Sequence, residues 1–413
     1  MALVEEAMAP GASSGFPSAD EVQQQLKALS DTASSYDASP EGHGSRMRLI
    51  GQAQELIASL TDPSDMGFKQ IGQAMELVAT RALLHIKAFQ HIPSEGSISL
   101  SDLAAATKCQ EAVLERLLRM LVCTGFVRQL PDGQYAHTKF SRAYAAMPGP
   151  GLYFQLIYDE SFLNIDNIHL FFDEKGWKEP VDQRYSPYAW KAGQEGTTIW
   201  EIMAQNPARF KAFQAGIGHA SASVPLTGFY NFSALNTTED DRPVLVDVGG
   251  GNGRSIMRIL QAHPDLPAHK FVLQDLPEVV KQVEQELPKE VKVMAHDFFT
   301  PQPVKGAKAY FFRWIMHDYS DPVCIDILKQ IVPAMAPDSV ILTADLFFPS
   351  KIAGPADIPN ATMDMVIFNM AGKERAQDDF KKVFEAAGLE FVKAHRLEGA
   401  SSGILEARLP TAK

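Results

Sequence analysis

The sequence has little cysteine, with three residues among 413 and no C-x-x-C spacing. Cys109, Cys123 and Cys324 therefore predict neither a disulfide framework nor a zinc cluster, and we interpret them as reduced core thiols. Long apolar runs are also missing: none reaches the roughly 18 to 20 residues that cross a bilayer, and the N-terminus lacks the pattern of a signal peptide. We therefore expect no membrane segment, no metal site and a cytoplasmic location.

Positive charge is scarce as well. Lysine and arginine number 38 against 50 acidic residues, which gives a formal net charge of −12, and there is no long basic run. Such a charge repels the phosphates of nucleic acids and anionic membranes, so neither is an expected partner. With 46% hydrophobic and 21% charged residues, the chain has the composition of a globular protein with two cored domains. A small neutral or weakly acidic organic substrate fits this composition and charge better than a nucleic acid or a membrane does.

The first third of the chain predicts a helical domain. Residues 1–18 are small, polar and rich in proline and glycine, which predicts a disordered tail. Apolar residues over 20–92 recur at spacings of three and four, which indicates amphipathic helices. Residues 99–125 read as a short capped helix and a longer one, and residues 126–137 as two short strands around a turn. Together these predict a helical, winged-helix domain over 19–150 whose apolar helices need a partner surface.

A winged helix also occurs in DNA-binding proteins, so that alternative has to be weighed. The expected recognition helix carries Glu111 and Glu115 beside Arg116 and Arg119. Its face is therefore not the basic surface that phosphate contacts require. Packing or dimerisation is the favoured role of this domain.

Large apolar side chains, many of them aromatic, are concentrated in residues 151–235. They predict a helical connector that lines a substrate pocket. An aromatic-rich core explains any single one of these residues equally well.

After Pro243 the pattern changes to short apolar runs separated by helix-like segments. The runs cover residues 244–248, 270–275, 291–297, 309–313 and 339–345. This alternation predicts an α/β fold with a doubly wound, mainly parallel sheet. Ligands bind such sheets at the carboxyl ends of the strands, and the acidic residues Asp247, Asp275, Asp297 and Asp345 fall there.

A glycine-rich turn, residues 249–253, follows the first of these runs. The dinucleotide fingerprint G-x-G-x-x-G fails because residue 254 is arginine. The glycines still admit a ligand close to the backbone, and Asp247 suits an ammonium or hydroxyl group better than a pyrophosphate. Asp275 is placed to accept the ribose hydroxyls and Asp297 to reach the adenine amine. These features favour S-adenosylmethionine, which has no phosphate and carries an amino group and a sulfonium.

A set of motifs, in its order and spacing, resembles the plant caffeate and flavonoid O-methyltransferases and their fungal relatives. The motifs are Asp247-Val-Gly-Gly-Gly-Asn-Gly, Leu273-Gln-Asp275-Leu-Pro, His296-Asp297-Phe-Phe, Arg313-Trp-Ile-Met-His317-Asp-Tyr-Ser-Asp and Gly372-Lys-Glu374-Arg. The resemblance runs from about residue 95 to the C-terminus. It implies a Rossmann-like class I methyltransferase domain over 236–413, a dimerisation domain before it, and a homodimer. Besides Asp247, the cofactor contacts that it implies are Gly249, Gly251, Asp275, Leu276, Asp297, Phe298 and Arg313.

Methyl transfer to oxygen needs an acceptor oxygen aligned with the sulfonium methyl and a group that removes its proton. A phenol with a pKa of about 10 is only about 0.1% ionised at pH 7, so a base that titrates near that pH, such as histidine, is useful. The resemblance implies that His317 is this base and that Asp345 and Glu374 flank it and fix its tautomer. The family often has glutamate where Asp345 stands. Glu374 is also consistent with a carboxylate at the start of the helix expected over 375–387.

By the same resemblance, the acceptor pocket is lined by Trp314, Met365, Phe368 and Asn369. The sequence thus predicts a metal-independent O-methyltransferase that acts on a phenolic or enolic hydroxyl of a small secondary metabolite. It does not name the acceptor, its regiochemistry or the pathway. A second hypothesis is a pericyclase or other cyclase that binds S-adenosylmethionine without using its methyl group; His317 and its two carboxylates argue against it. A third, a DNA-binding regulator, is disfavoured by the acidic charge.

Overall fold

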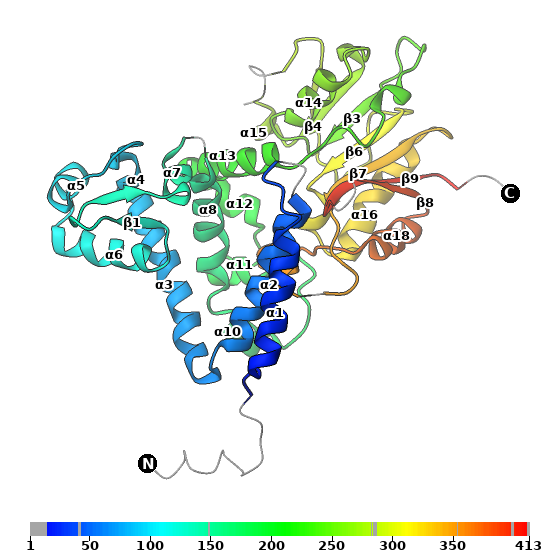
Figure 1. The fold of residues 1–413 in the computed structure, drawn as a ribbon. Helices are drawn as coiled ribbons and strands as arrows, with labels where there is room; N and C mark the ends of the chain where they lie inside the picture. Colours follow the sequence, from blue (N-terminus) through cyan, green and yellow to red (C-terminus); the bar gives the residue numbers. More distant parts are fainter. Residues whose placement is uncertain are drawn as a thin grey trace. The chain divides into compact units, whose positions relative to one another are not determined.

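The computed structural model describes residues 15–39, 43–147, 149–281, 283, 287–352, 354–397 and 400–410 (Figure 1). Most of the predicted tail, residues 1–14, lies outside this part of the chain. The described residues divide into two compact units. One runs up to Ala146 and includes Lys351–Pro359; the other comprises Met147–Ser350 and the residues from Asn360 onward. Within the described ranges, no helix is both long and apolar enough to cross a membrane.

The first unit is mainly helical. Its elements are α1 (Ala19–Ala33), α2 (His43–Leu60), α3 (Met66–His85), α4 (Ala88–His91), α5 (Leu100–Thr107), α6 (Glu111–Cys123), β1 (Val127–Gln129), β2 (Tyr135–His137) and α7 (Lys139–Ala145). Ser18 begins α1 because its side chain accepts the amide of Glu21 in a capping box, and Ser99 caps α5. The antiparallel pair β1–β2 is the predicted hairpin. Buried leucines such as Leu83 and Leu118 form the core of this unit.

The second unit opens with short helices. They are α8 (Pro150–Ile157), α9 (Leu163–Ile165), α10 (Ile168–Lys175), α11 (Pro187–Lys191), α12 (Ile199–Ala204) and α13 (Pro207–Ser223). A five-residue π-helix, Tyr158–Phe162, joins α8 to α9. Ser186, Thr198 and Asn206 each begin one of these helices by accepting a backbone amide. π-helical turns inside helices are frequent at functional sites.

A seven-stranded sheet follows, in the order β5-β4-β3-β6-β7-β9-β8. Its strands are β3 (Leu245–Val248), β4 (Phe271–Asp275), β5 (Lys292–Ala295), β6 (Ala309–Arg313), β7 (Val340–Leu346), β8 (Glu390–His395) and β9 (Ser402–Arg408). The first five run parallel, and β9 pairs antiparallel with β7 and β8. The connecting helices are α14 (Arg254–Ala262), α15 (Pro277–Val280), α16 (Asp321–Ile331), α17 (Ile358–Phe368) and α18 (Gln377–Ala386). The predicted α/β class and mainly parallel sheet are confirmed; the β8–β9 pair was not predicted.

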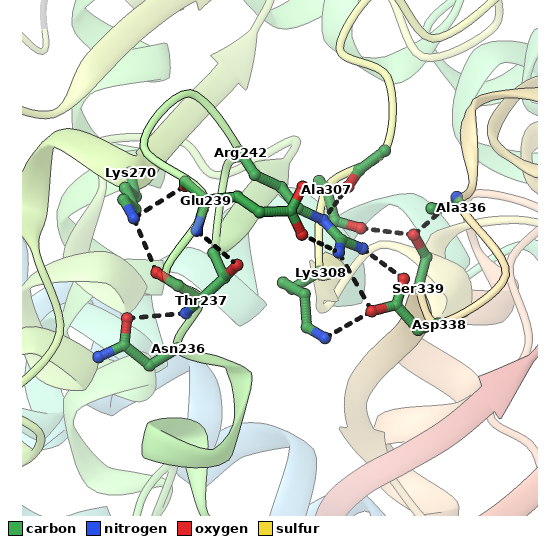
Figure 2. Close-up of polar contacts among 11 residues, drawn as sticks. Asn236, Thr237, Glu239, Arg242, Lys270, Ala307, Lys308, Ala336, Asp338 and Ser339 are labelled. Carbon is green, nitrogen blue, oxygen red and sulfur yellow. Dashed lines mark hydrogen bonds and ion pairs between the residues drawn. The ribbon is translucent and has the colours of Figure 1, made fainter.

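A polar network joins the segments that precede β3, β4, β6 and β7 (Figure 2). Arg242, just before β3, donates to the carbonyl of Gly306 before β6 (2.7 Å) and pairs with Asp338 before β7. Lys270, just before β4, donates to the carbonyl of Thr237 (2.8 Å). These contacts hold the amino ends of the strands in register. The opposite, carboxyl edge of the sheet is where a parallel fold binds its ligand.

Candidate active site

A cavity of about 1740 Å³ lies at the carboxyl ends of β3, β4 and β6 in the second unit. Residues of α8, α12, α13 and α17 complete its wall. Of the residues singled out in the sequence, it is lined by Gly249, Gly251, Asp275, Leu276, Asp297, Phe298, Trp314, His317 and Asn369. Segments more than a hundred residues apart in the chain therefore meet at one cavity.

The glycine turn forms one side of this cavity. Gly249 has φ +70°, and a Cβ there would lie 2.7 Å from Cδ1 of Ile315, so only glycine fits. The amide of Gly251 donates to Oδ2 of Asp275 (2.8 Å), which locks the turn to the end of β4. With no side chains on the glycines, the backbone of the turn is open to a ligand.

Asp275 is shaped to accept hydrogen bonds from a ligand as well. Its Oδ1 accepts the amide of Leu276 (2.7 Å) and its Oδ2 that of Gly251. Burial raises the pKa of Asp275 above its ordinary value, although the two backbone donors lower it. A carboxylate has about four lone-pair sites, so acceptor capacity remains for the paired hydroxyls of a ribose. A carboxylate with free acceptor sites beside an open glycine turn fits the ribose of a nucleoside.

Asp247 and Arg313 are not among the described residues that line the cavity. Asp247 is fully buried in β3, and neither of its carboxylate oxygens has a hydrogen-bond partner in the described part of the chain. A Cβ at Gly250 would lie 2.6 Å from its Cγ, so the carboxylate sits directly beneath the turn. Burial raises the pKa of Asp247 to about 7, and Arg313 opposes the shift. Direct contact of either residue with a cofactor stays a prediction.

His317 lies in the 3₁₀ turn Met316–Asp318 after β6 and is surrounded by carboxylates. Its Nδ1 is 2.9 Å from Oε1 of Glu374 and 3.6 Å from Oδ1 of Asp345. Its Nε2 is 3.4 Å from Oδ1 of Asp318. All four side chains are buried. The fold therefore brings together the histidine and the two acidic residues that the sequence singled out.

Burial and neighbouring charges shift the pKa values of His317, Asp345 and Asp318. Burial by itself lowers the pKa of His317, but the three carboxylates, that of Glu374 foremost, raise it to about 10. Burial raises the pKa of Asp345 to about 7 and that of Asp318 to about 6, with His317 acting in the opposite direction. At neutral pH the cluster therefore favours an imidazolium held between carboxylates.

Asp318 was missed by the sequence reasoning, although it lies inside a motif that was quoted and lines the cavity. The position of Asp318 directly after His317, the candidate base, is the feature of the sequence that could have predicted its place in the site.

The expected acceptor-pocket residues separate into two groups. Trp314 lines the cavity with a left-handed backbone, φ +54°, which is uncommon for a residue with a large side chain. Asn369 lines it too, is 1% exposed, and has a buried Oδ1 without a partner among the described residues. Met365 is 48% exposed and does not line the cavity. Phe368 stacks on Phe172 and lines a separate cavity of about 400 Å³.

The helical period of α17 explains this difference. Within α17, Val366 and Ile367 line the cavity, three and four residues after Met363, which lines it too. Met365 falls between them and therefore faces away. A motif match located the right helix but not the face that it turns to the cavity.

A buried carboxylate in the cavity wall, Glu160, was also missed, together with its ion pair to Arg209. Glu160, in the π-helix, accepts from Arg209 (2.7 Å) and from the hydroxyl of Tyr188 (2.7 Å). The side chain of Asn369 donates to the backbone carbonyl of Glu160 (3.2 Å). This contact joins the residue that follows α17 to the π-helix beside the cavity. Glu160 belongs to no recognisable motif, and it lies in a segment whose sequence predicted only an aromatic-rich helical connector.

Comparison with known proteins decides which family builds such a site. Residues 178–390, more than half of the chain, match the family model described as the O-methyltransferase domain. The chain belongs to the O-methyltransferase family. Residues 72–147 match the O-methyltransferase dimerisation domain. The protein is accordingly an S-adenosylmethionine-dependent O-methyltransferase, and the resemblance inferred from the motifs is confirmed.

Fungal O-methyltransferases are among its relatives. Methyltransferase cfoD of Aspergillus candidus is 30% identical over 380 residues, which cover 89% of this chain and 93% of the relative. O-methyltransferase hmp5 of Hypomyces subiculosus is 30% identical over 400 residues, which cover 95% of this chain and 98% of the relative. OxaC, solved in complex with SAH and oxaline, has a TM-score of 0.86 and 26% identity over 95% of this chain and 99% of its own. LepI in complex with SAM has a TM-score of 0.82 at 24% identity, covers 95% of this chain and all of its own, and shares the fold.

Proposed function

We propose that this O-methyltransferase methylates a phenolic or enolic hydroxyl of a small secondary metabolite and that His317 is the general base. The observation that carries the proposal is the position of His317. Its imidazole lines the cavity while its Nδ1 lies 2.9 Å from Oε1 of Glu374, behind it. A base needs one nitrogen toward the acceptor and an orienting partner on the other.

S-adenosylmethionine, when bound, supplies a methyl group activated by the sulfonium. Gly249, Gly251 and Asp275 are the residues that we expect to hold its adenosine part, because the open turn and the free lone pairs of Asp275 suit a ribose. Asp297 and Phe298 line the cavity next to them. The proposed cofactor end and His317 are thus parts of one cavity wall.

His317 acts through a specific tautomer in this proposal. With Nδ1–H donating to Glu374, the lone pair on Nε2 can take the proton of an acceptor hydroxyl. Asp318, 3.4 Å from that nitrogen, lies where the hydroxyl would approach. The imidazolium that forms is stabilised by the surrounding carboxylates. Because the pKa of His317 in the free protein is raised to about 10, the base form becomes more abundant as the pH rises.

Trp314 and Asn369 are the pocket residues that the geometry supports best. The Trp314 indole gives an apolar wall on which an aromatic acceptor can lie. The Oδ1 of Asn369, which has no partner in the described part of the chain, can accept a hydrogen bond from it. Met363 and Val366 replace Met365 in the proposed pocket. Glu160, which lines the same cavity, is paired with Arg209.

The decisive experiment follows S-adenosylhomocysteine formation from methyl-labelled S-adenosylmethionine with a panel of phenolic and polyketide-like hydroxyl compounds. We expect acceptor-dependent turnover that falls about 10²- to 10⁴-fold in His317→Ala, the range of a general base. The matched control is His169→Ala, an exposed histidine on α10, which should turn over like the wild type.

Two outcomes would contradict the proposal. Undiminished methylation by His317→Ala would exclude His317 as the base. Tight cofactor binding without methyl transfer to any acceptor would favour the pericyclase alternative, for which the likeness to LepI supplies only the shared fold.

A further inference from the structure

Arg254 is a cavity residue for which the proposed mechanism has no use. It is the first residue of α14 and follows the glycine turn directly. Its side chain lines the same cavity as Gly251 and Asp275. In the sequence it is the residue that breaks the dinucleotide fingerprint.

A glycine on the opposite wall makes room for the guanidinium of Arg254. Gly218 lies in the interior of α13, and a Cβ there would lie 2.9 Å from Cζ of Arg254 and closer still to its Nη1. Gly218 is helical, so no unusual backbone angle requires glycine. Glycine lowers helix stability relative to alanine. Its presence at this point is explained by the guanidinium, which occupies the space of the missing side chain.

Arg254 has no anionic partner within the described residues, whereas the other basic side chains in the wall have partners. Arg184 pairs with Asp182 (2.8 Å), and His317 lies against Glu374. His219 makes a contact of its own. Among the described lining residues, Arg254 is therefore the cation that remains for a ligand, and it lies at the turn where the cofactor is proposed to bind.

We propose that Arg254 binds the carboxylate of the amino-acid part of S-adenosylmethionine and S-adenosylhomocysteine. The adenosine is neutral, and the ammonium and sulfonium are cationic, so this carboxylate is the ligand's one anion. A guanidinium fork matches a carboxylate in shape, and the start of a nine-residue helix also favours an anion. In a chain of net charge −12, a carboxylate needs such a partner. The inference rests on the proposed cofactor position at Gly251 and Asp275.

A pair of ligands tests this assignment by binding alone. S-adenosylhomocysteine has the carboxylate, whereas 5′-methylthioadenosine keeps the adenosine and thioether and lacks the amino-acid end. Isothermal titration should show that Arg254→Met lowers the affinity for S-adenosylhomocysteine about ten- to a hundredfold, as expected for the loss of a hydrogen bond to a charged group. The affinity for 5′-methylthioadenosine should stay within about threefold of the wild type.

Gly218→Ala provides a second, independent variant. Its new Cβ displaces the guanidinium, so it should weaken S-adenosylhomocysteine selectively while alanine supports the helix. The matched control is Arg258→Met, one turn along α14, whose guanidinium bonds the carbonyls of Ser221 and Val224 and does not line the cavity. Any effect of that variant should be equal for both ligands.

Failure of the inference and failure of the cofactor placement give different results. If Arg254→Met and Gly218→Ala bind S-adenosylhomocysteine like the wild type, or weaken both ligands equally, Arg254 does not hold the carboxylate. Asp275→Asn should weaken both ligands, because both contain the ribose. If it weakens neither, the proposed cofactor position is wrong, and the assignment of Arg254 falls with it.

Discussion

His317 shows how a single buried side chain takes its properties from its neighbours. Three carboxylates lie within 3.6 Å of its ring nitrogens, and burial of the cluster reduces the screening of their charges by solvent. The imidazolium is therefore stabilised in the free protein. Before His317 can act as a base it has to lose this proton, and the pH at which it does so is set by the carboxylates.

Replacing Glu374 should move that pH. The pKa of His317 is raised chiefly by Glu374, so Glu374→Gln lowers it, and the acidic limb of the kcat/KM profile should shift by about one unit or more to lower pH. The plateau should fall about tenfold to a hundredfold, because the imidazole loses its orienting carboxylate. Rates measured from pH 6 to pH 10 test this. Glu385→Gln, an exposed carboxylate on α18, is the control; a limb that stays in place would refute the role of Glu374.

Asp247 should make the stability of the free protein depend on pH. Its pKa is raised from 3.8 to about 7 by burial. A raised carboxyl pKa contributes stability that is complete below about pH 4 and is lost as the pH rises through about 7. Asp247→Asn should therefore flatten the dependence between pH 5 and pH 8, by up to about 3 kcal/mol. Urea unfolding at both pH values measures this. An unchanged slope in Asp247→Asn would show that another group is responsible.

The two ends of the parallel strands differ in function: the carboxyl ends border the cavity, and the amino ends are joined by a polar network. The carboxyl ends of β4 and β6 lead into the cavity, while the segments before β3 and β7 are joined by the network of Figure 2. In that network the pKa of Asp338 is held well below its ordinary value by hydrogen bonds from Arg242 and Lys308. Stability and ligand binding should therefore be separable by mutation.

Arg242→Met tests this separation. Arg242 has a side chain only 14% exposed, and its loss leaves the Gly306 carbonyl and Asp338 without their partner, so we expect about 1 to 2 kcal/mol lower stability. The affinity for S-adenosylhomocysteine should not change, because the network lies at the other end of the strands. Lys382→Met is the control: its ion pair with Asp379 is on the surface, with the lysine 74% exposed, and should contribute little. A loss of affinity in Arg242→Met would contradict the separation.

For the whole molecule, the exposed apolar face of α3 bears on assembly. Phe68, Ile71, Met75 and Val78 are spaced by three or four residues and are between 42% and 87% exposed. A helix with such a stripe facing solvent is typical of a protein interface. Part of α3 lies in the segment that matches the dimerisation domain. We therefore propose that the α3 stripe belongs to the interface of a homodimer.

Charges on the stripe should separate the subunits. The wild type is expected at about 91 kDa, twice 45.4 kDa, in analytical ultracentrifugation. The double variant Phe68→Glu with Ile71→Glu should sediment as a monomer, because buried unpaired charges oppose association. Lys69→Glu, an exposed polar position on the same helix, should remain a dimer. A monomeric wild type would exclude the proposed interface.

The local sequence pattern determined much of the fold and several residues of the site. Apolar runs followed by turn residues specified the parallel strands, the glycines specified the open turn, and the motifs located Asp275, His317 and Glu374. These features are readable because each depends on residues close together in the chain. The edge pair β8–β9 was missed because its strands follow the last of the α/β repeats on which the prediction was based.

Contacts between distant segments were decided only by the tertiary structure. Packing set which face of α17 meets the cavity, buried Asp247 beneath the turn, and placed Glu160 against Arg209. It also brought Arg254 against Gly218, two residues in different helices that no local period connects. A sequence pattern records the neighbours of a residue along the chain, whereas its charge state and its access to a ligand depend on neighbours in space, which only the packed fold supplies.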